Sequence, residues 1–166
     1  MTSQTDPIVV LTTGGTIDKH YFDALSEYQI GESMVAGLLH RARVTQPFEI
    51  VELLRKDSLE LTDSDRALIH ARVRAAGASR IVITHGTDTM VATAQALADV
   101  PGKTIVLVGA LGPARFAESD ASFNLGMAFA TAQMAPPGVY ITMNGIVFRA
   151  GAVVKDRALG AFIPKD

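Results

Sequence analysis

Short apolar runs that alternate with helix-length segments are the feature that most limits how this chain can fold. Strands that are apolar throughout belong to parallel sheets covered on both faces, and the stretches between most of these runs have the apolar spacing of helices. The pattern therefore predicts an α/β fold, a doubly wound and mostly parallel sheet with helices on both faces. The runs are IVVLTT (8–13), FEIVELL (48–54), RIVITH (80–85), KTIVLVG (103–109) and GVYITM (138–143), and the helical stretches are 31–43, 62–77, 89–99 and 123–135.

Local signals mark where some of these elements begin and end. Thr62 followed by Asp65 resembles a capping box with Asp in place of Glu, and Gly77 is expected to end that helix. After residue 138 the alternation changes, and Asn144-Gly145 between two apolar runs predicts a C-terminal β-hairpin. With no internal repeat and no linker, we expect residues 1–166 to form a single domain.

Composition excludes several classes of function. The 166 residues carry 15 Lys and Arg against 17 Asp and Glu, a net charge of −2, so no general basic field favours a nucleic-acid partner. The chain has no cysteine, which excludes disulfides and thiolate sites, and its histidines lack paired ligand spacing, so we expect no metal and no other cofactor. No apolar stretch is long enough to span a membrane and the N-terminus has no signal-peptide pattern, so a cytoplasmic protein is expected.

Glycines and threonines follow two of the apolar runs, in LTTGGTI (11–17) and THGTDT (84–89). Ligands of open parallel sheets bind beyond the carboxyl ends of the strands, where both motifs would lie. Glycines there allow tight turns and leave backbone N–H groups open to a ligand, while Thr16 would hold its hydroxyl at the rim. Thr and Asp at a helix start are also ordinary N-caps, but the two motifs at two ends of one sheet favour a binding site.

The side chains at these turns suit acyl transfer better than nucleotide binding. Glycine turns before helices can bind phosphate, yet neither GxxxxGK[ST] nor GxGxxG is present. Threonine hydroxyls could serve as nucleophiles, backbone N–H groups as oxyanion donors, a carboxylate could hold an ammonium, and a lysine or tyrosine could move protons.

The motifs TTGGTID (12–18) and ITHGTDTM (83–90) resemble the two signatures of the bacterial-type L-asparaginase/glutaminase family. Other segments that resemble the family are YQIG (28–31), KDSLELTD (56–63), VGALGPARFAESDASFN (108–124) and VVKDRALGAF (153–162). The resemblance covers nearly all of this chain but only the N-terminal domain of a usual member. It implies hydrolysis of L-asparagine to L-aspartate and ammonia through a threonine acyl-enzyme, without a cofactor.

Carried over residue by residue, the resemblance gives each candidate a role. Thr16 would be the nucleophile and Tyr28 the loop tyrosine that activates it, although Tyr21 lies in the same expected loop. The remaining candidates are a proton-transfer cluster, Thr87, Asp88 and Lys155, and residues that bind substrate, Gly15, Ser58, Thr87 and Asp88. Without the resemblance, Lys155 would be an ordinary solvated lysine of an edge hairpin, and His85 a packed, hydrogen-bonded histidine.

The resemblance also sets expectations for assembly. The chain ends at Asp166, so the second domain of the family is not expected in it, nor is the acidic residue that a neighbouring subunit usually contributes. An apolar surface without that domain favours a homodimer or homotetramer. A non-catalytic amino-acid-binding regulatory module is the alternative from another class, and a phosphate-binding module is a more distant one.

Overall fold

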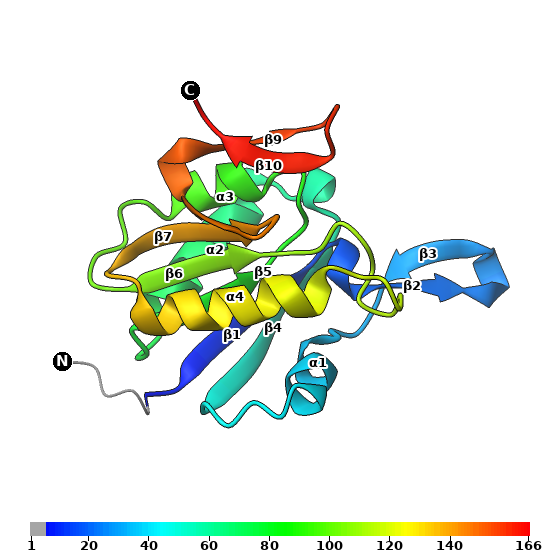
Figure 1. The fold of residues 1–166 in the computed structure, drawn as a ribbon, viewed down its shortest axis with the longest axis horizontal. Helices are drawn as coiled ribbons and strands as arrows, with labels where there is room; N and C mark the ends of the chain where they lie inside the picture. The colour runs from blue at the N-terminus through cyan, green and yellow to red at the C-terminus, as the bar shows by residue number, and fades with distance from the viewer. Residues whose placement is uncertain (1–5) are drawn as a thin grey trace.

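The computed structural model describes residues 6–166, which form a six-stranded sheet with helices on both faces (Figure 1). The spatial order of its strands is β4-β1-β5-β6-β7-β8; all pairs are parallel except β7 with β8. The strands are β1 (Ile8–Gly14), β4 (Phe48–Lys56), β5 (Arg80–Thr84), β6 (Thr104–Val108), β7 (Gly138–Met143) and β8 (Ile146–Arg149). The predicted parallel strands are all present, so the predicted fold class is confirmed.

The apolar side chains divide into two cores, one on each face of the sheet. Ile81 and Ile83 of β5 face the layer of α2 (Asp63–Ala75) and α3 (Met90–Ala96). Val82, between them, faces the layer of α1 (Val35–Arg41) and α4 (Ala121–Met134). Alternation along a strand sends successive side chains to opposite faces, so a strand that is apolar throughout fills both cores.

The helix and turn signals are confirmed at their key positions. Thr62 accepts from the Asp65 backbone N–H while the Asp65 carboxylate accepts from Thr62 N–H, which completes the capping box at the start of α2. Asn144 and Gly145 both have positive φ, the conformation of a two-residue hairpin turn between β7 and β8. Helix α2 ends at Ala75, two residues before Gly77, which does not adopt positive φ.

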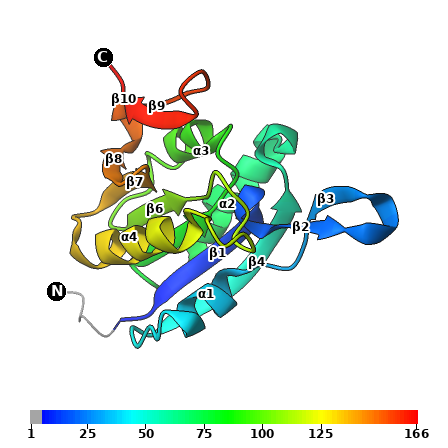
Figure 2. The same ribbon diagram turned by 45° about the vertical axis from the view of Figure 1, so that its right-hand side comes forward.

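Of two further hairpins, the first was not predicted from the sequence, whereas a hairpin that carries Lys155 near the C-terminus was expected. The segment expected to be a loop around Tyr21 and Tyr28 is a hairpin of β2 (Lys19–Phe22) and β3 (Glu27–Ile30), which projects from the body of the protein (Figures 1 and 2). After β8, the strands β9 (Val153–Asp156) and β10 (Ala161–Pro164) form a second hairpin beside α3. Phe162 anchors it in the α2–α3 core.

The strand order creates a switch point between β1 and β5. From β1 the chain crosses to β4 on one side and then returns to β5 on the other side. In open parallel sheets, the crevice beyond the carboxyl ends of such neighbours is the usual place for a ligand. The two glycine-threonine motifs follow β1 and β5, so both lie at this point. Among residues 6–166, no helix is both long and apolar enough to cross a bilayer.

Candidate active site

The glycine turns after β1 and β5 touch each other. Gly15 has φ of 90°, and a Cβ placed on it would lie 2.5 Å from the Cα of Gly86. A Cβ on Gly86 would lie 2.6 Å from the Cβ of Ser58 and 2.7 Å from its Oγ. These distances leave no room for a side chain at either glycine. The glycines therefore bring three segments that are far apart in the sequence into direct contact.

Ser58 is held in this contact by Thr89. The Thr89 hydroxyl donates to the Ser58 carbonyl at 2.8 Å, and the Thr89 backbone N–H donates to Ser58 Oγ at 3.3 Å. Asp57 accepts from the Leu59 N–H at 3.0 Å and pairs with Lys19 at 3.2 Å, which fixes the 3₁₀ turn that carries Ser58. Since Ser58 Oγ accepts from Thr89, its own proton remains available to a substrate oxygen.

Lys155 reaches across from β9 to the second motif. Its Nζ donates to Thr87 Oγ1 and to Asp88 Oδ1, both at 2.8 Å. The side chain of Lys155 is 16% exposed and that of Asp88 30%, so the contact is partly shielded from water. The structure thus brings these residues together, although Thr87 and Lys155 are 68 residues apart in the sequence. We call Gly15, Ser58, Gly86, Thr87, Asp88 and Lys155 the strand-end cluster.

Thr16 lies at the edge of this cluster. It begins the 3₁₀ turn Thr16–Asp18 and is half-buried. Thr16 and Thr87 each follow one of the two touching glycines, so their backbones leave the same point of the sheet. Within residues 6–166 no hydrogen bond joins the two hydroxyls, and Thr16 Oγ1 is left open to a ligand.

The structure does not bring Tyr28 into the cluster. Tyr28 and Tyr21 are cross-strand partners in the β2–β3 hairpin, with ring centroids 5.4 Å apart, and both are about half exposed. Tyr28 also stacks edge-on against Phe116 at 5.9 Å. No hydrogen bond within residues 6–166 joins either hydroxyl to Thr16, so the choice between the two tyrosines stays a prediction.

His85 has the packed role expected of it. Its Nδ1 lies 2.6 Å from the Gly86 carbonyl and its Nε2 2.8 Å from Thr93 Oγ1. A carbonyl can only accept, so Nδ1 carries the proton and Nε2 accepts from Thr93. Burial lowers the pKa of His85 to about 4, and the neutral ring fixes the glycine turn instead of carrying protons to a substrate.

Two residues of the site received no role from the sequence. Asp18 is 2% exposed and accepts from the Met34 N–H at 2.9 Å, while burial raises its pKa to about 6. Asp18 is the last residue of TTGGTID (12–18), and this position in the first motif could have identified it from the sequence. Arg157 lies 3.7 Å from Asp88, opposite Lys155, and nothing in the sequence pattern distinguished it from a solvated arginine.

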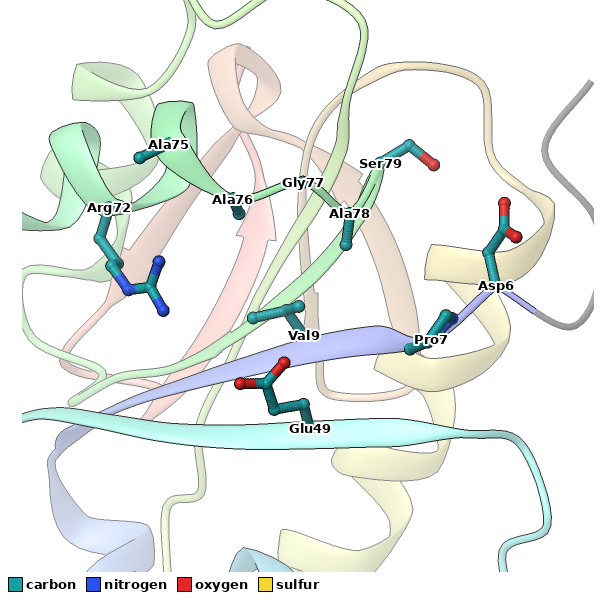
Figure 3. Close-up of a pocket in the computed structure, with 10 residues that line it drawn as sticks. All are labelled: Asp6, Pro7, Val9, Glu49, Arg72, Ala75, Ala76, Gly77, Ala78 and Ser79. Carbon is teal, nitrogen blue, oxygen red and sulfur yellow. The ribbon is translucent and has the colours of Figure 1, made fainter.

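A separate hollow lies at the opposite end of the sheet (Figure 3). It is formed by the starts of β1 and β4 and by the end of α2, and its charged side chains are Asp6, Glu49 and Arg72. No predicted site residue lines it. Because the strands are parallel, the full length of the sheet separates it from the strand-end cluster.

Comparison with known proteins finds relatives along most of the chain. Residues 7–162 match the family model described as "Asparaginase, N-terminal". The chain is 33% identical to an L-asparaginase of Thermococcus kodakarensis, over 92% of this chain and 48% of the relative. It is 31% identical to L-asparaginase 2 of Escherichia coli, over 89% and 46%. A shorter stretch, 42% of this chain and 17% of the relative, is 46% identical to a glutamyl-tRNA(Gln) amidotransferase subunit of Methanococcus vannielii.

Solved structures give the same result. The thermostable L-asparaginase of Thermococcus kodakarensis superimposes with a TM-score of 0.85 at 30% identity, over 95% of this chain and 51% of that one. A probable cytoplasmic L-asparaginase of Campylobacter jejuni superimposes with a TM-score of 0.78 at 28% identity, over 96% and 51%. The chain therefore spans about half the length of the relatives it matches.

Proposed function

Because this chain belongs to the asparaginase family, which it matches through the N-terminal domain, we propose that it hydrolyses L-asparagine to L-aspartate and ammonia. The observation that carries the proposal is the contact of Lys155 with both Thr87 and Asp88, beside the paired glycine turns. The Thr87 hydroxyl, the Lys155 ammonium and the Asp88 carboxylate meet beyond the end of β5, and a hydrolysis of this kind would use these three groups. The names of the relatives supply the substrate, an amide of an amino acid.

The proposed reaction uses a threonine as a nucleophile in two steps. The Thr16 hydroxyl attacks the side-chain amide carbon, the C–N bond breaks, and the threonine proton leaves with the nitrogen as ammonia. Water then attacks the acyl-threonine ester, releases L-aspartate and restores the hydroxyl. The Gly15 N–H already donates to the Lys56 carbonyl at 3.0 Å, so other backbone N–H groups of the two turns would supply donors for the oxyanion in both steps. Thr87 is the second candidate nucleophile, since Lys155 contacts its hydroxyl directly.

Asp88 and Ser58 have complementary chemistry for the rest of the substrate. The Asp88 carboxylate would accept from the α-ammonium, and the free proton of Ser58 would donate to the α-carboxylate. Asp88→Asn keeps the shape and removes the charge, so we expect substrate binding to weaken by about 1.5–3 kcal/mol, as for a charge-assisted hydrogen bond. Asparagine should be preferred to glutamine, because fixed oxyanion donors tolerate little displacement of the carbonyl.

We also propose that the chain works as a homodimer or homotetramer in the cytoplasm. The exposed ring of Tyr28 contacts the exposed rings of Tyr21 and Phe116, and the three rings form an apolar patch of the kind that partner subunits cover. The Asp88 side chain that would hold the α-ammonium is 30% exposed, so water competes with the substrate and we expect weak binding, with KM on the order of 1 mM or higher. Light scattering at micromolar concentration and a saturation curve test both expectations.

The decisive experiment measures ammonia release from L-asparagine by the purified 166-residue chain. Thr45→Ala, which changes an exposed threonine far from the cluster in the sequence, is the matched control for Thr16→Ala and Thr87→Ala. Ammonia release that persists in Thr45→Ala and is lost in Thr16→Ala or Thr87→Ala supports the proposal. Saturable asparagine binding without any release favours the alternative, an amino-acid-binding regulatory module.

A further inference from the structure

Arg80, the first residue of β5, is buried and has no counter-ion among residues 6–166. The residue is 6% exposed, and its Nη1 has no hydrogen-bond partner in the described part of the chain. None of the ion pairs within residues 6–166 includes it, whereas Arg55, for example, meets Glu52 at 2.8 Å. A guanidinium removed from water and left unpaired is destabilising, so a group outside residues 6–166 is its natural complement.

A small cleft adjoins this side chain. Its volume is about 110 Å³, the space of three to four water molecules at about 30 Å³ each. Thr104 lines the cleft but donates its hydroxyl to the Ala135 carbonyl at 3.0 Å, and Gln133 donates to the Phe129 carbonyl at 2.9 Å. Ser79 lines both this cleft and the hollow of Figure 3.

The charges around the cleft do not neutralise Arg80. Arg80 shares the sheet face of Val82, which α4 covers, and the last turn of α4 borders the cleft. A helix C-terminus carries roughly half a negative charge, which holds the guanidinium but leaves a net positive site.

We propose that this cleft binds a small oxyanion, a carboxylate or phosphate group, through the Arg80 guanidinium. The planar guanidinium fork matches two oxygens of either group, and the volume admits the group itself but not a nucleotide. The site lies at the start of β5, whereas Thr87 and Asp88 follow the end of the same strand. It is thus separate from the proposed active site and does not depend on the proposed function.

Titrations of the purified chain with sodium phosphate, sodium acetate and sodium chloride at matched ionic strength test the site. The readouts are the thermal unfolding midpoint and the backbone amide NMR signals. Phosphate or acetate should raise the midpoint saturably and shift the amides of residues 79, 80, 102 and 104, and the stronger of the two salts identifies the oxyanion. Chloride, which lacks the paired oxygens, should have a weaker effect.

Arginine variants test whether Arg80 binds the oxyanion. Arg80→Met keeps the length of the side chain and should weaken oxyanion binding about tenfold or more, as expected for the loss of a charge-assisted hydrogen bond. Arg74→Met, an exposed arginine of α2, is the matched control and should bind as the wild type does. If Arg80→Met does not fold, Arg80→Lys, which keeps the charge without the fork, should bind more weakly than the wild type.

Three results would overturn the proposal. The first is equal anion dependence in the wild type and the Arg80 variants. The second is an effect that follows ionic strength alone, with chloride as effective as phosphate and acetate. The third is the absence of saturable shifts near residues 79–80 and 102–104, in which case the end of α4 alone compensates Arg80.

Discussion

The strand-end cluster and the β2–β3 hairpin hold the two parts of the proposed site, and they are built in opposite ways. In the cluster, backbone touches backbone at Gly15 and Gly86, and Lys155 joins two side chains at 2.8 Å. In the hairpin, Tyr21 and Tyr28 are about half exposed and contact each other through ring edges, and Tyr28 also contacts Phe116 in this way. The closely packed region is thus the strand-end cluster, where the bond to the amide would form. The hairpin, which would complete the site, is held by few contacts.

The largest expected effect on kcat follows from removing the hydroxyl of Thr16, at the edge of the cluster, or that of Thr87, within it. Thr16→Ala should lower kcat by ~10³-fold or more with little change in stability, as expected for the loss of a nucleophile from a half-buried position. Thr87→Ala should act through the same site, because Lys155 would lose its hydroxyl partner there. Ammonia release and urea unfolding of each variant are the measurements.

The comparison of the two threonines also assigns the nucleophile. Mass spectrometry after rapid acid quenching should detect an acyl adduct on the reacting threonine and none in its alanine variant. Turnover close to that of the wild type in both variants would exclude threonine chemistry altogether.

The next effect tests the hairpin. If Tyr28 activates the nucleophile, Tyr28→Phe should lower kcat by about 10²-fold, the lower end for general acid–base catalysis, while the ring contact with Phe116 remains. Tyr21→Phe, on the cross-strand partner, is the matched control and should leave kcat unchanged. The reverse result would assign the role to Tyr21, and full activity in both variants would remove the hairpin from the chemistry.

A smaller effect tests how the cluster is fixed. Gly86→Ala forces a Cβ against Ser58, so we expect a loss of about 1–3 kcal/mol in the free energy of unfolding, as for overpacking. Gly126→Ala, inside α4 with open space around the glycine, should instead stabilise by about 0.5–1 kcal/mol. Denaturant unfolding measures both, and equal effects of the two substitutions would show that the glycine contact is not what holds the site together.

The cluster was predictable because its signals are local and its geometry follows from the sheet. Glycines after β-branched runs identify the ends of parallel strands, and parallel strands place those ends at one edge. The motifs alone therefore place Gly15, Thr16 and Thr87 at the same end of the sheet. The position of Lys155 came from the family resemblance, because no local pattern shows that β9 passes beside Asp88.

The hairpin and the oxyanion cleft were not predictable in the same way. The β2–β3 strands are four residues each and contain polar residues, so propensity does not distinguish them from a loop, and the contact of Tyr28 with Phe116 is seen only in the tertiary structure. In the sequence, Arg80 stands before an apolar run like any ordinary arginine beside a strand, and nothing there indicates its burial. Its burial depends on α4 lying across the same face of the sheet, which only the tertiary structure shows.

Asp18 follows the first glycine turn and bonds to the base of the β2–β3 hairpin. Its titration should give the smallest of the expected effects, a change in the free energy of unfolding. Its carbonyl accepts from the Gly31 N–H at the base of the hairpin, and its buried carboxylate accepts from the Met34 N–H. Burial raises its pKa from the ordinary value of 3.8 to about 6, so the folded protein holds the proton more tightly than the unfolded chain does. The stabilising contribution of Asp18 is therefore complete below pH 3.8 and is lost as the pH rises through 6.

Asp18→Asn should remove this dependence and keep the bond from Met34. At pH 8 we expect the variant to be more stable than the wild type by about 1 kcal/mol, since the gain from burying a neutral group is partly offset by a weaker acceptor. Below pH 4 the difference should vanish. Protonation of His85, whose lowered pKa removes stability as the pH falls from 6.5 toward 4, occurs in both proteins, so the difference between them isolates Asp18. Urea unfolding at pH 8, 6 and 4 measures it, and a constant difference across these values would show that the Asp18 carboxylate does not titrate in this range.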